Sequence, residues 1–149
     1  MRLTAYSKKL VAHAMFDKGK HFLAAAVLLL KQNGHPEVVR HLLAQGLEVI
    51  QKGLLLAKDY DRYQPRLKYK LGHSLVRGSN ALRACYGFRP LQTDVLRELQ
   101  KLSAYYEDHL LRYGTIEDLL GAGGRELAIE RVARRTVALV RFGNRLFSR

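Results

Sequence analysis

The sequence predicts an all-α protein, an up-and-down bundle of about five helices that forms one domain over residues 1–149. Long segments repeat their apolar residues at steps of three and four, the spacing that gathers side chains on one face of an α-helix. No segment shows the strict alternation of apolar and polar residues that indicates a strand, and only three prolines occur in 149 residues. A chain of this length buries roughly two-thirds of its unfolded surface, so a self-sufficient core is expected.

The first helix is expected from about Thr4 to Gln32, and Asn33-Gly34 offers the left-handed backbone that ends a helix. Gly19 is the point at which this segment is expected to divide into two helices. Its predicted inward face consists of Val11, Met15, Phe22, Ala25 and Leu29. The apolar run within it, residues 22–30, is much shorter than the roughly 20 residues of a membrane-spanning helix. A soluble, cytoplasmic protein without membrane contact is therefore expected.

The second helix, which Pro36 suits as its first residue, is predicted to be the centre of the bundle. Its main apolar stripe consists of Val39, Leu43, Leu47, Ile50, Leu54 and Ala57. Gly46 and Gly53 lie on a second stripe, and each costs about 1 kcal/mol of helix propensity relative to alanine. Close approach of another helix, within the bundle or across a dimer, is the expected compensation. Glu48 and Lys52 are expected to form an i,i+4 pair on the polar side.

Residues 58–70 are predicted to form a loop, because Pro65 interrupts or kinks a helix. A third helix is expected after Gly72, ending near residues 86–87 before a turn at 88–90. Its predicted inward residues are Leu71, Leu75 and Leu82.

A fourth helix is expected from Thr93-Asp94 to residues 112–114. Its predicted inward face consists of Val95, Leu99, Leu102, Tyr106 and Leu110. A short capped helix at 115–120 and a glycine joint at 121–124 follow. The last helix is expected over 125–147, with the inward residues Ile129, Val132, Leu139, Phe142 and Leu146.

Charge limits the class of partner. The formal net charge is +13 and the pI is near 10.2, which indicates a polyanionic partner, most simply nucleic acid. Residues 1–34 carry +5, 58–89 carry +6 and 125–149 carry +5, whereas 35–57 are neutral and 90–124 carry −3. In the last helix a basic stripe, interpreted either as a solvated face or as phosphate contacts, consists of Arg134, Arg141, Arg145 and Arg149.

Aromatic and basic residues interleave between Lys58 and Lys70. Such tyrosines stack on unpaired bases or pack their rings against the bundle, and packing is the role expected for Tyr69. The predicted nucleic-acid contacts are Arg62, Tyr63 and Lys68 in this segment, together with Arg134, Arg141 and Arg145 in the last helix.

The motif Gly72-His73-Ser74-Leu75 is the sharpest local feature. It places His73 near the start of a helix, a position that binds anions and favours a neutral imidazole able to act as a base. Arg66 and Lys70 precede it and are the candidate partners. A structural alternative is that His73 caps the helix or bonds a buried carbonyl.

No metal and no cofactor are expected. His13, Asp17 and His21 share one helical face, interpreted as the polar face of the first helix rather than a metal site. The single cysteine, Cys85, excludes an intramolecular disulfide, fits a reducing cytosol and is expected to be a small buried hydrophobe.

Three short motifs in the middle of the chain resemble the HEPN superfamily of helical domains, which occur in toxins and defence ribonucleases. They are L-E-V-I-Q-K-G-L-L-L at 47–56, G-H-S-L at 72–75 and L-R-Y-G at 111–114, so the resemblance covers about residues 38–115. It implies a four- or five-helix bundle that commonly dimerises. It also implies that an Arg and a following His, here Arg66 and His73, cleave RNA without a metal in the catalytic members.

Three functional hypotheses follow. The first is a homodimeric HEPN-like module of a toxin–antitoxin or defence system that binds nucleic acid, preferably RNA. The second is a metal-independent endoribonuclease. In that mechanism His73 takes the proton of a ribose 2′-hydroxyl while Arg66 or Lys70 stabilises the phosphorane. The third is a non-catalytic module that docks an acidic protein partner.

Overall fold

The structure is a computed structural model that describes residues 2–87, 94–108 and 129–149. These residues contain six α-helices and no strand, which confirms the all-α bundle. The helices are α1 (Ala5–Lys31), α2 (Pro36–Lys58), α3 (Tyr60–Tyr63), α4 (Leu75–Tyr86), α5 (Leu96–Glu107) and α8 (Glu130–Phe147). The predicted turn at 88–90, Leu110, the short helix at 115–120 and the glycine joint lie outside the described residues. Helix α5 ends at Glu107, earlier than the predicted end at 112–114.

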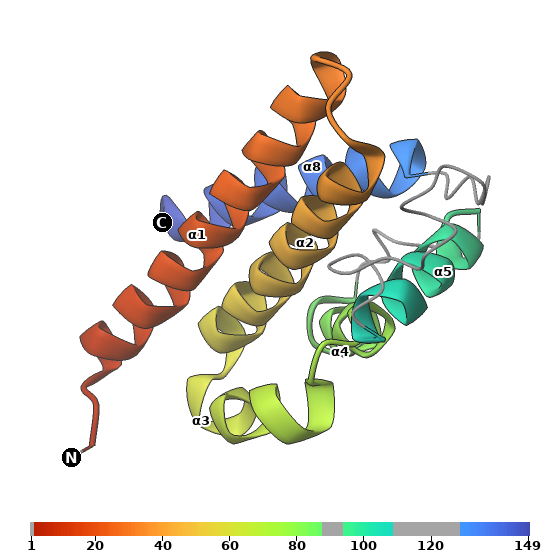
Figure 1. Cartoon of the computed structure of the whole chain (residues 1–149). Helices are drawn as coiled ribbons and strands as arrows, with labels where there is room; N and C mark the ends of the chain where they lie inside the picture. Colours follow the sequence, from red (N-terminus) through yellow and green to blue (C-terminus); the bar gives the residue numbers. More distant parts are fainter. Residues whose placement is uncertain (1, 88–93, 109–128) are drawn as a thin grey trace.

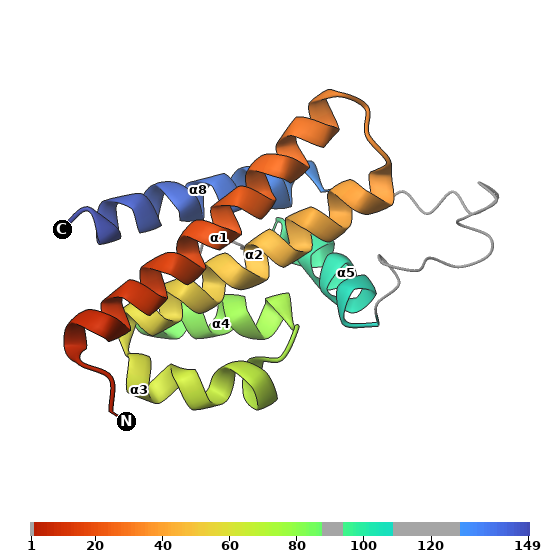
Figure 2. The same ribbon diagram turned by 60° about the vertical axis from the view of Figure 1, so that its left-hand side comes forward.

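Helix α2 is the centre of the bundle, as predicted. It contacts α1, α3, α4, α5 and α8, and the other helices surround it in two views (Figures 1 and 2). The large residues of its main stripe are all buried: Val39, Leu43, Leu47, Ile50 and Leu54. Ala57, at the end of the stripe, is only half-buried. Burial of a continuous stripe against five neighbours makes α2 the element on which the others pack.

Helices α1 and α2 form a tight antiparallel hairpin along a seam of glycines (Figure 1). A Cβ atom built on Gly53 would lie 2.7 Å from the backbone nitrogen of Phe16, and one on Gly46 would lie 3.0 Å from that of Leu23. The predicted close approach is therefore present, and the partner is α1 of the same chain. Gly19 does not divide α1, which runs unbroken for 27 residues, because Gly19 faces the backbone of Ile50 in this seam.

The predicted inward face of α1 was wrong by one position. The buried residues are Ala12, Phe16, Gly19, Leu23 and Ala26, whereas Val11 is 38% exposed. Apolar residues occur on several sides of α1, so periodicity alone does not select one. The seam selects the side that carries Gly19, whose Cβ would meet Ile50, while Gly46 and Gly53 of α2 leave room for the backbone at Leu23 and Phe16.

Residues 58–70 are helical, not a loop. Asp59 caps α3 by accepting a hydrogen bond from the backbone N–H of Arg62. A 3₁₀ turn, η1 (Gln64–Arg66), and a wider π turn, η2 (Leu67–Leu71), then continue to Gly72, whose φ of +54° ends the segment. Pro65 lies in the first turn of η1, where its missing N–H costs no hydrogen bond. We call residues 60–71 the basic bend.

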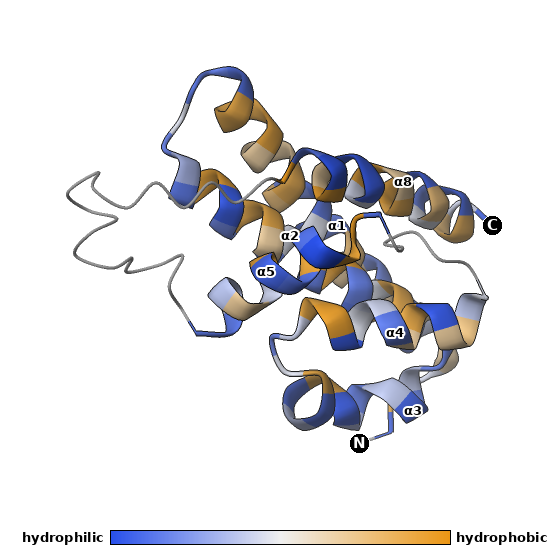
Figure 3. Ribbon diagram, turned by 90° about the vertical axis from the view of Figure 1, so that its right-hand side faces the viewer, coloured by the Kyte–Doolittle hydropathy of each residue, from blue (hydrophilic) through white to orange (hydrophobic). Residues whose placement is uncertain are grey.

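The remaining helices bury the residues expected of them. Inward residues of the third and fourth predicted helices are buried in the structure: Leu71, Leu75, Leu82, Val95, Leu99, Leu102 and Tyr106. In α8 the buried residues include Ile129, Val132 and Leu139, and Phe142 and Leu146 are half-buried. Hydrophilic and hydrophobic positions alternate along α8 accordingly (Figure 3). None of the helices in the described ranges combines the length and apolar character needed to cross a bilayer.

The seam predicts that Gly53→Ala destabilises the protein. Alanine gains about 1 kcal/mol of helix propensity, but its Cβ would meet the Phe16 backbone, and overpacking costs about 1–3 kcal/mol. We expect a net loss of up to about 2 kcal/mol in the free energy of unfolding, measured by urea denaturation. Lys18→Ala, at an exposed position of α1, is the control and should change stability by less than about 0.5 kcal/mol. A more stable Gly53→Ala protein would contradict the tight seam.

Candidate functional site

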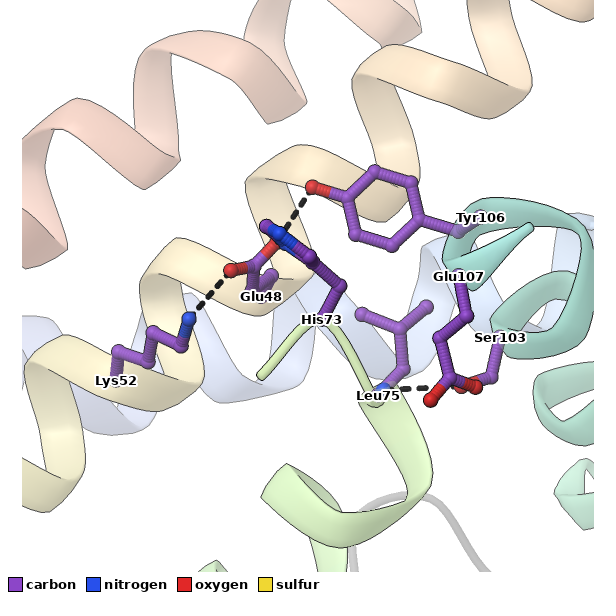
Figure 4. A network of polar contacts seen from close by, with 7 residues as sticks. All are labelled: Glu48, Lys52, His73, Leu75, Ser103, Tyr106 and Glu107. Atoms are coloured by element: carbon purple, nitrogen blue, oxygen red, sulfur yellow. Dashed lines mark hydrogen bonds and ion pairs between the residues drawn. The ribbon is translucent and has the colours of Figure 1, made fainter. Parts of the chain in front are cut away.

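A buried carboxylate on the central helix organises the polar part of the structure. Glu48 is 8% exposed, and its two oxygens receive donors from three elements (Figure 4). Lys52 Nζ lies 2.5 Å from Oε1, and His73 Nδ1 lies 3.2 Å from Oε2. The Tyr106 hydroxyl, from the last turn of α5, donates to the same Oε2. Together these donors make the carboxylate the meeting point of α2, α5 and the segment before α4.

This environment corrects the expectation that Glu48 and Lys52 form a solvated surface pair. The pair exists, but both side chains are largely buried. Burial alone would raise the pKa of the Glu48 carboxyl. The hydrogen bonds from Lys52, Tyr106 and His73, with the Lys52 charge, hold that pKa below its ordinary value instead. The carboxylate is therefore ionised at neutral pH.

The segment that carries His73 is held from both sides. Gln51 Nε2 of α2 donates to the carbonyl of Leu75 at 3.1 Å, and the Leu75 N–H donates to Ser103 Oγ of α5 at 3.0 Å. Ser74 caps α4 by accepting from the backbone N–H of Arg77. These contacts fix the backbone directly after His73, so the imidazole position is set by the fold rather than by solvent.

The contact with Glu48 assigns a protonation pattern to His73. An ionised carboxylate only accepts hydrogen bonds, so Nδ1 carries the proton and Nε2 is the nitrogen that takes up a proton when the ring is neutral. The side chain is 56% exposed. It lines a hollow of about 260 Å³ together with Met15, Lys52, Leu67, Lys68 and Gly72. An oriented imidazole beside two lysines is suited to proton transfer next to an anion.

The hollow does not contain the partners predicted for His73. Arg66 is half-buried in η1, and Lys70 is exposed at the end of η2 with its carbonyl bonded to Arg77. Neither residue lines the hollow, where Lys52 and Lys68 supply the positive charge. Sequence reasoning missed Glu48, Lys52 and Tyr106 as members of the site. The available signal was that Glu48, Gln51 and Lys52 are polar residues in the middle of a helix whose other residues there are mainly apolar.

The basic bend presents cations but only part of the predicted aromatic surface. Arg62, Lys68 and Lys70 are exposed, and within the described ranges none of them forms an ion pair. Tyr63 is 5% exposed, so its ring is not accessible to a base. Tyr69 is 80% exposed with Lys68 Nζ 5.3 Å from its ring centroid, which contradicts the packing role predicted for it. Tyr69 is the tyrosine of the η turns that a base can reach.

The last helix divides its arginines into two groups. Arg131 and Arg135 pair with Glu98 and Asp94 near the start of α5. The predicted stripe is exposed, and no ion pair within the described part of the chain involves its members: Arg134, Arg141, Arg145 and Arg149. The stripe therefore remains available to an external anion.

The other candidate residues have structural partners. His13 packs its ring against Phe147, and Asp17 pairs with Lys20 at 2.9 Å. In the described ranges, no group of three or more His, Cys, Asp or Glu side chains is placed to hold a metal ion. Cys85 is half-buried, and burial raises the pKa of its thiol, which disfavours the reactive thiolate.

Comparison with known proteins adds no relative: no family model matches the chain, and neither a curated protein nor a solved structure matches it significantly. The functional argument therefore depends on the residues of this chain and their geometry.

The buried carboxylate predicts a large effect of Glu48→Gln on stability. Without the charge, Lys52 is left largely buried and unpaired, and breaking such a pair costs about 3–5 kcal/mol. We expect a loss of about 3 kcal/mol in the free energy of unfolding at pH 7. The double variant Glu48→Gln/Lys52→Met should recover most of it, because it removes both charges.

Glu48→Gln also tests whether the Glu48 carboxylate makes stability depend on pH. The folded-state pKa of Glu48 is depressed, so its contribution is present above the ordinary value of 4.5 and is lost as the pH falls below it. The free energy of unfolding, measured between pH 7 and pH 3, should fall more steeply for the unmodified protein than for Glu48→Gln. Parallel curves would contradict an ionised, hydrogen-bonded Glu48.

Proposed function

We propose that this protein is an RNA-binding module whose contact surface is the end of the bundle where its basic segments meet. Residues from the start of α1, from α3 and from the end of α8 line one groove, among them Lys9, Tyr60 and Arg149. The N-terminus, α3 and the C-terminus lie toward the same side of the molecule (Figure 2). This convergence of three basic segments is the observation that carries the proposal.

The cations at this end are free to bind phosphates. Apart from Lys8, which pairs with Asp61, no ion pair within the described residues involves the following exposed cations: Arg2, Lys9, Arg62, Lys68, Lys70, Arg145 and Arg149. Phosphate contacts of this kind supply the sequence-independent part of nucleic-acid affinity. Exposed Tyr69 adds a ring on which an unpaired base can stack.

Homodimerisation belongs to the same proposal. Tyr6 and Leu10 near the start of α1 and Leu28 near its end are exposed on one side of the helix. Asp17 and His21 lie between them on the same side, so the exposed apolar surface forms two patches. Such patches on the outside of a helix are suited to packing against a second copy.

The proposal predicts salt-dependent RNA binding that weakens when the basic bend is neutralised. The triple variant Arg62→Gln/Lys68→Gln/Lys70→Gln should lower affinity for a fluorescein-labelled oligoribonucleotide. It should also reduce the slope of log K against log salt by about 0.7 per lost phosphate contact, measured by anisotropy at several salt concentrations. Lys101→Gln, an exposed cation on α5, should leave both unchanged. Absence of binding at low salt would reject the proposal and favour an acidic protein partner.

A second candidate function is cleavage of the bound RNA, and the Glu48–His73 contact favours it. With Nδ1 bonded to the carboxylate, Nε2 of the neutral ring is the base that takes the proton of a ribose 2′-hydroxyl. The 2′-oxygen then attacks the adjacent phosphorus, the 5′-oxygen leaves, and a 2′,3′-cyclic phosphate forms. Lys52 and Lys68, which line the same hollow, would stabilise the phosphorane in place of Arg66 and Lys70.

Cleavage predicts a specific effect of His73→Asn. The asparagine amide retains a donor near the position of Nδ1 for Glu48 but lacks Nε2, so folding and RNA binding should persist while cleavage falls by at least about 100-fold. Product analysis should show 2′,3′-cyclic phosphate ends for the unmodified protein, with EDTA having no effect. Equal cleavage by His73→Asn would show that His73 is not the base of the reaction, and no cleavage by the unmodified protein would leave only the binding function.

A further inference from the structure

A groove at the basic end of the bundle is separate from the hollow at His73. It encloses about 650 Å³, within the range of about 300–1,000 Å³ that is usual for ligand sites. The floor is apolar and is formed by Leu56, Ala57, Leu146 and Phe147. Ala5, Lys8 and Lys9 from α1, Tyr60 and Asp61 from α3, and Arg149 line the rest. The groove thus has an apolar floor, and the charged side chains around its opening are predominantly cationic.

A second hollow adjoins the first. It encloses about 560 Å³ and is lined by Arg2, Leu3, Lys8, Tyr60, Asp61 and Gln64. The two hollows share Lys8, Tyr60 and Asp61. Lys8 Nζ lies 2.6 Å from Asp61 Oδ2 and 5.9 Å from the centroid of the Tyr60 ring, so this cluster divides them. Two neighbouring hollows with the Lys8 cation between them are suited to two consecutive units of a polymer whose units are joined by anionic groups.

The polar groups favour a nucleic acid over an acidic peptide. Lys9 and Arg149 are exposed, and no ion pair within the described ranges involves them, so each can bind a phosphate. Asp61 is 76% exposed at the shared wall. Its carboxylate can accept hydrogen bonds from ribose hydroxyls and from the amino groups of bases, donors that acidic side chains lack.

We propose that the two hollows bind consecutive nucleotides of single-stranded RNA, with an unpaired base inserted against the apolar floor of the groove. This inference rests on the proposed RNA-binding function and specifies the class of RNA. Bases in a duplex are paired and stacked inward, so they cannot reach a floor recessed between helices, whereas unpaired bases can be splayed outward. Phosphates on either side then contact Lys9, Lys8 and Arg149.

The test is to fill the groove without changing its charge. Ala5 is an exposed residue in the first turn of α1 that lines the groove, so Ala5→Phe should occupy the space of the base. Ala104→Phe, at an exposed position of α5 that does not line the groove, is the matched control. The probes are a labelled single-stranded oligouridylate, the same strand with abasic sites, and a blunt RNA duplex of equal length.

The expected result is an affinity for oligouridylate about tenfold lower in Ala5→Phe, with little change for the duplex or the abasic strand. Ala104→Phe should bind all three probes like the unmodified protein. Unchanged affinity of Ala5→Phe for oligouridylate would overturn base insertion while leaving RNA binding intact. Equal losses on all three probes would also overturn it, since the groove would then contact phosphates alone. No binding of any probe by the unmodified protein would instead reject the proposed function itself.

Discussion

The ionised carboxylate of Glu48 is the constraint on which the polar half of the structure depends. A buried charge is tolerated only when donors surround it, and here the donors come from α2 itself, from the segment before α4 and from the end of α5. Satisfying one side chain therefore fixes the relative position of three elements. Apolar packing between α2, α4 and α5 alone would tolerate small shifts of one helix along another. The hydrogen-bonded carboxylate does not tolerate such shifts. His73 therefore has a defined position at the edge of its hollow.

The glycine seam between α1 and α2 determines where the positive charge of the molecule gathers. Because α1 lies directly against α2, the start of α1 reaches the end of α2 and the beginning of α3, where Lys8 contacts Asp61. Two of the basic segments of the sequence are thereby joined, and the end of α8 adds a third. Near the start of α5, acidic side chains instead pair with Arg131 and Arg135. The net charge of +13 is thus unevenly distributed, and a polyanion bound at the basic end relieves repulsion among the exposed cations there.

Features that depend on a local sequence pattern could be predicted. Features that depend on the surface packed against a helix could not. The inward stripe of α2 was predictable because large apolar residues recur along it at steps of three and four. The side of α1 was not, because it depends on which residues lie against Gly46 and Gly53, here Leu23 and Phe16, and only the packed pair of helices reveals this. Pro65 suggested a loop, yet a proline in the first turn of a helix is compatible with helical structure. His73 stood out by its motif, whereas its contact with Glu48 spans 25 residues and that of Tyr106 spans 58, beyond any local spacing rule.

The basic bend connects the two places where RNA chemistry is proposed. Tyr60, Asp61 and Gln64 at its start line the paired hollows, and Leu67 and Lys68 near its end line the hollow of His73. Tyr60 and Lys68 are eight positions apart along consecutive helical turns, so they lie on the order of 10 Å apart, a distance that a short RNA segment spans. Under the proposed function, a base held in the groove would determine which ribose reaches the imidazole. Binding and cleavage would then be successive steps at neighbouring sites, and cleavage would also require the 2′-hydroxyl to lie in line with the adjacent phosphorus.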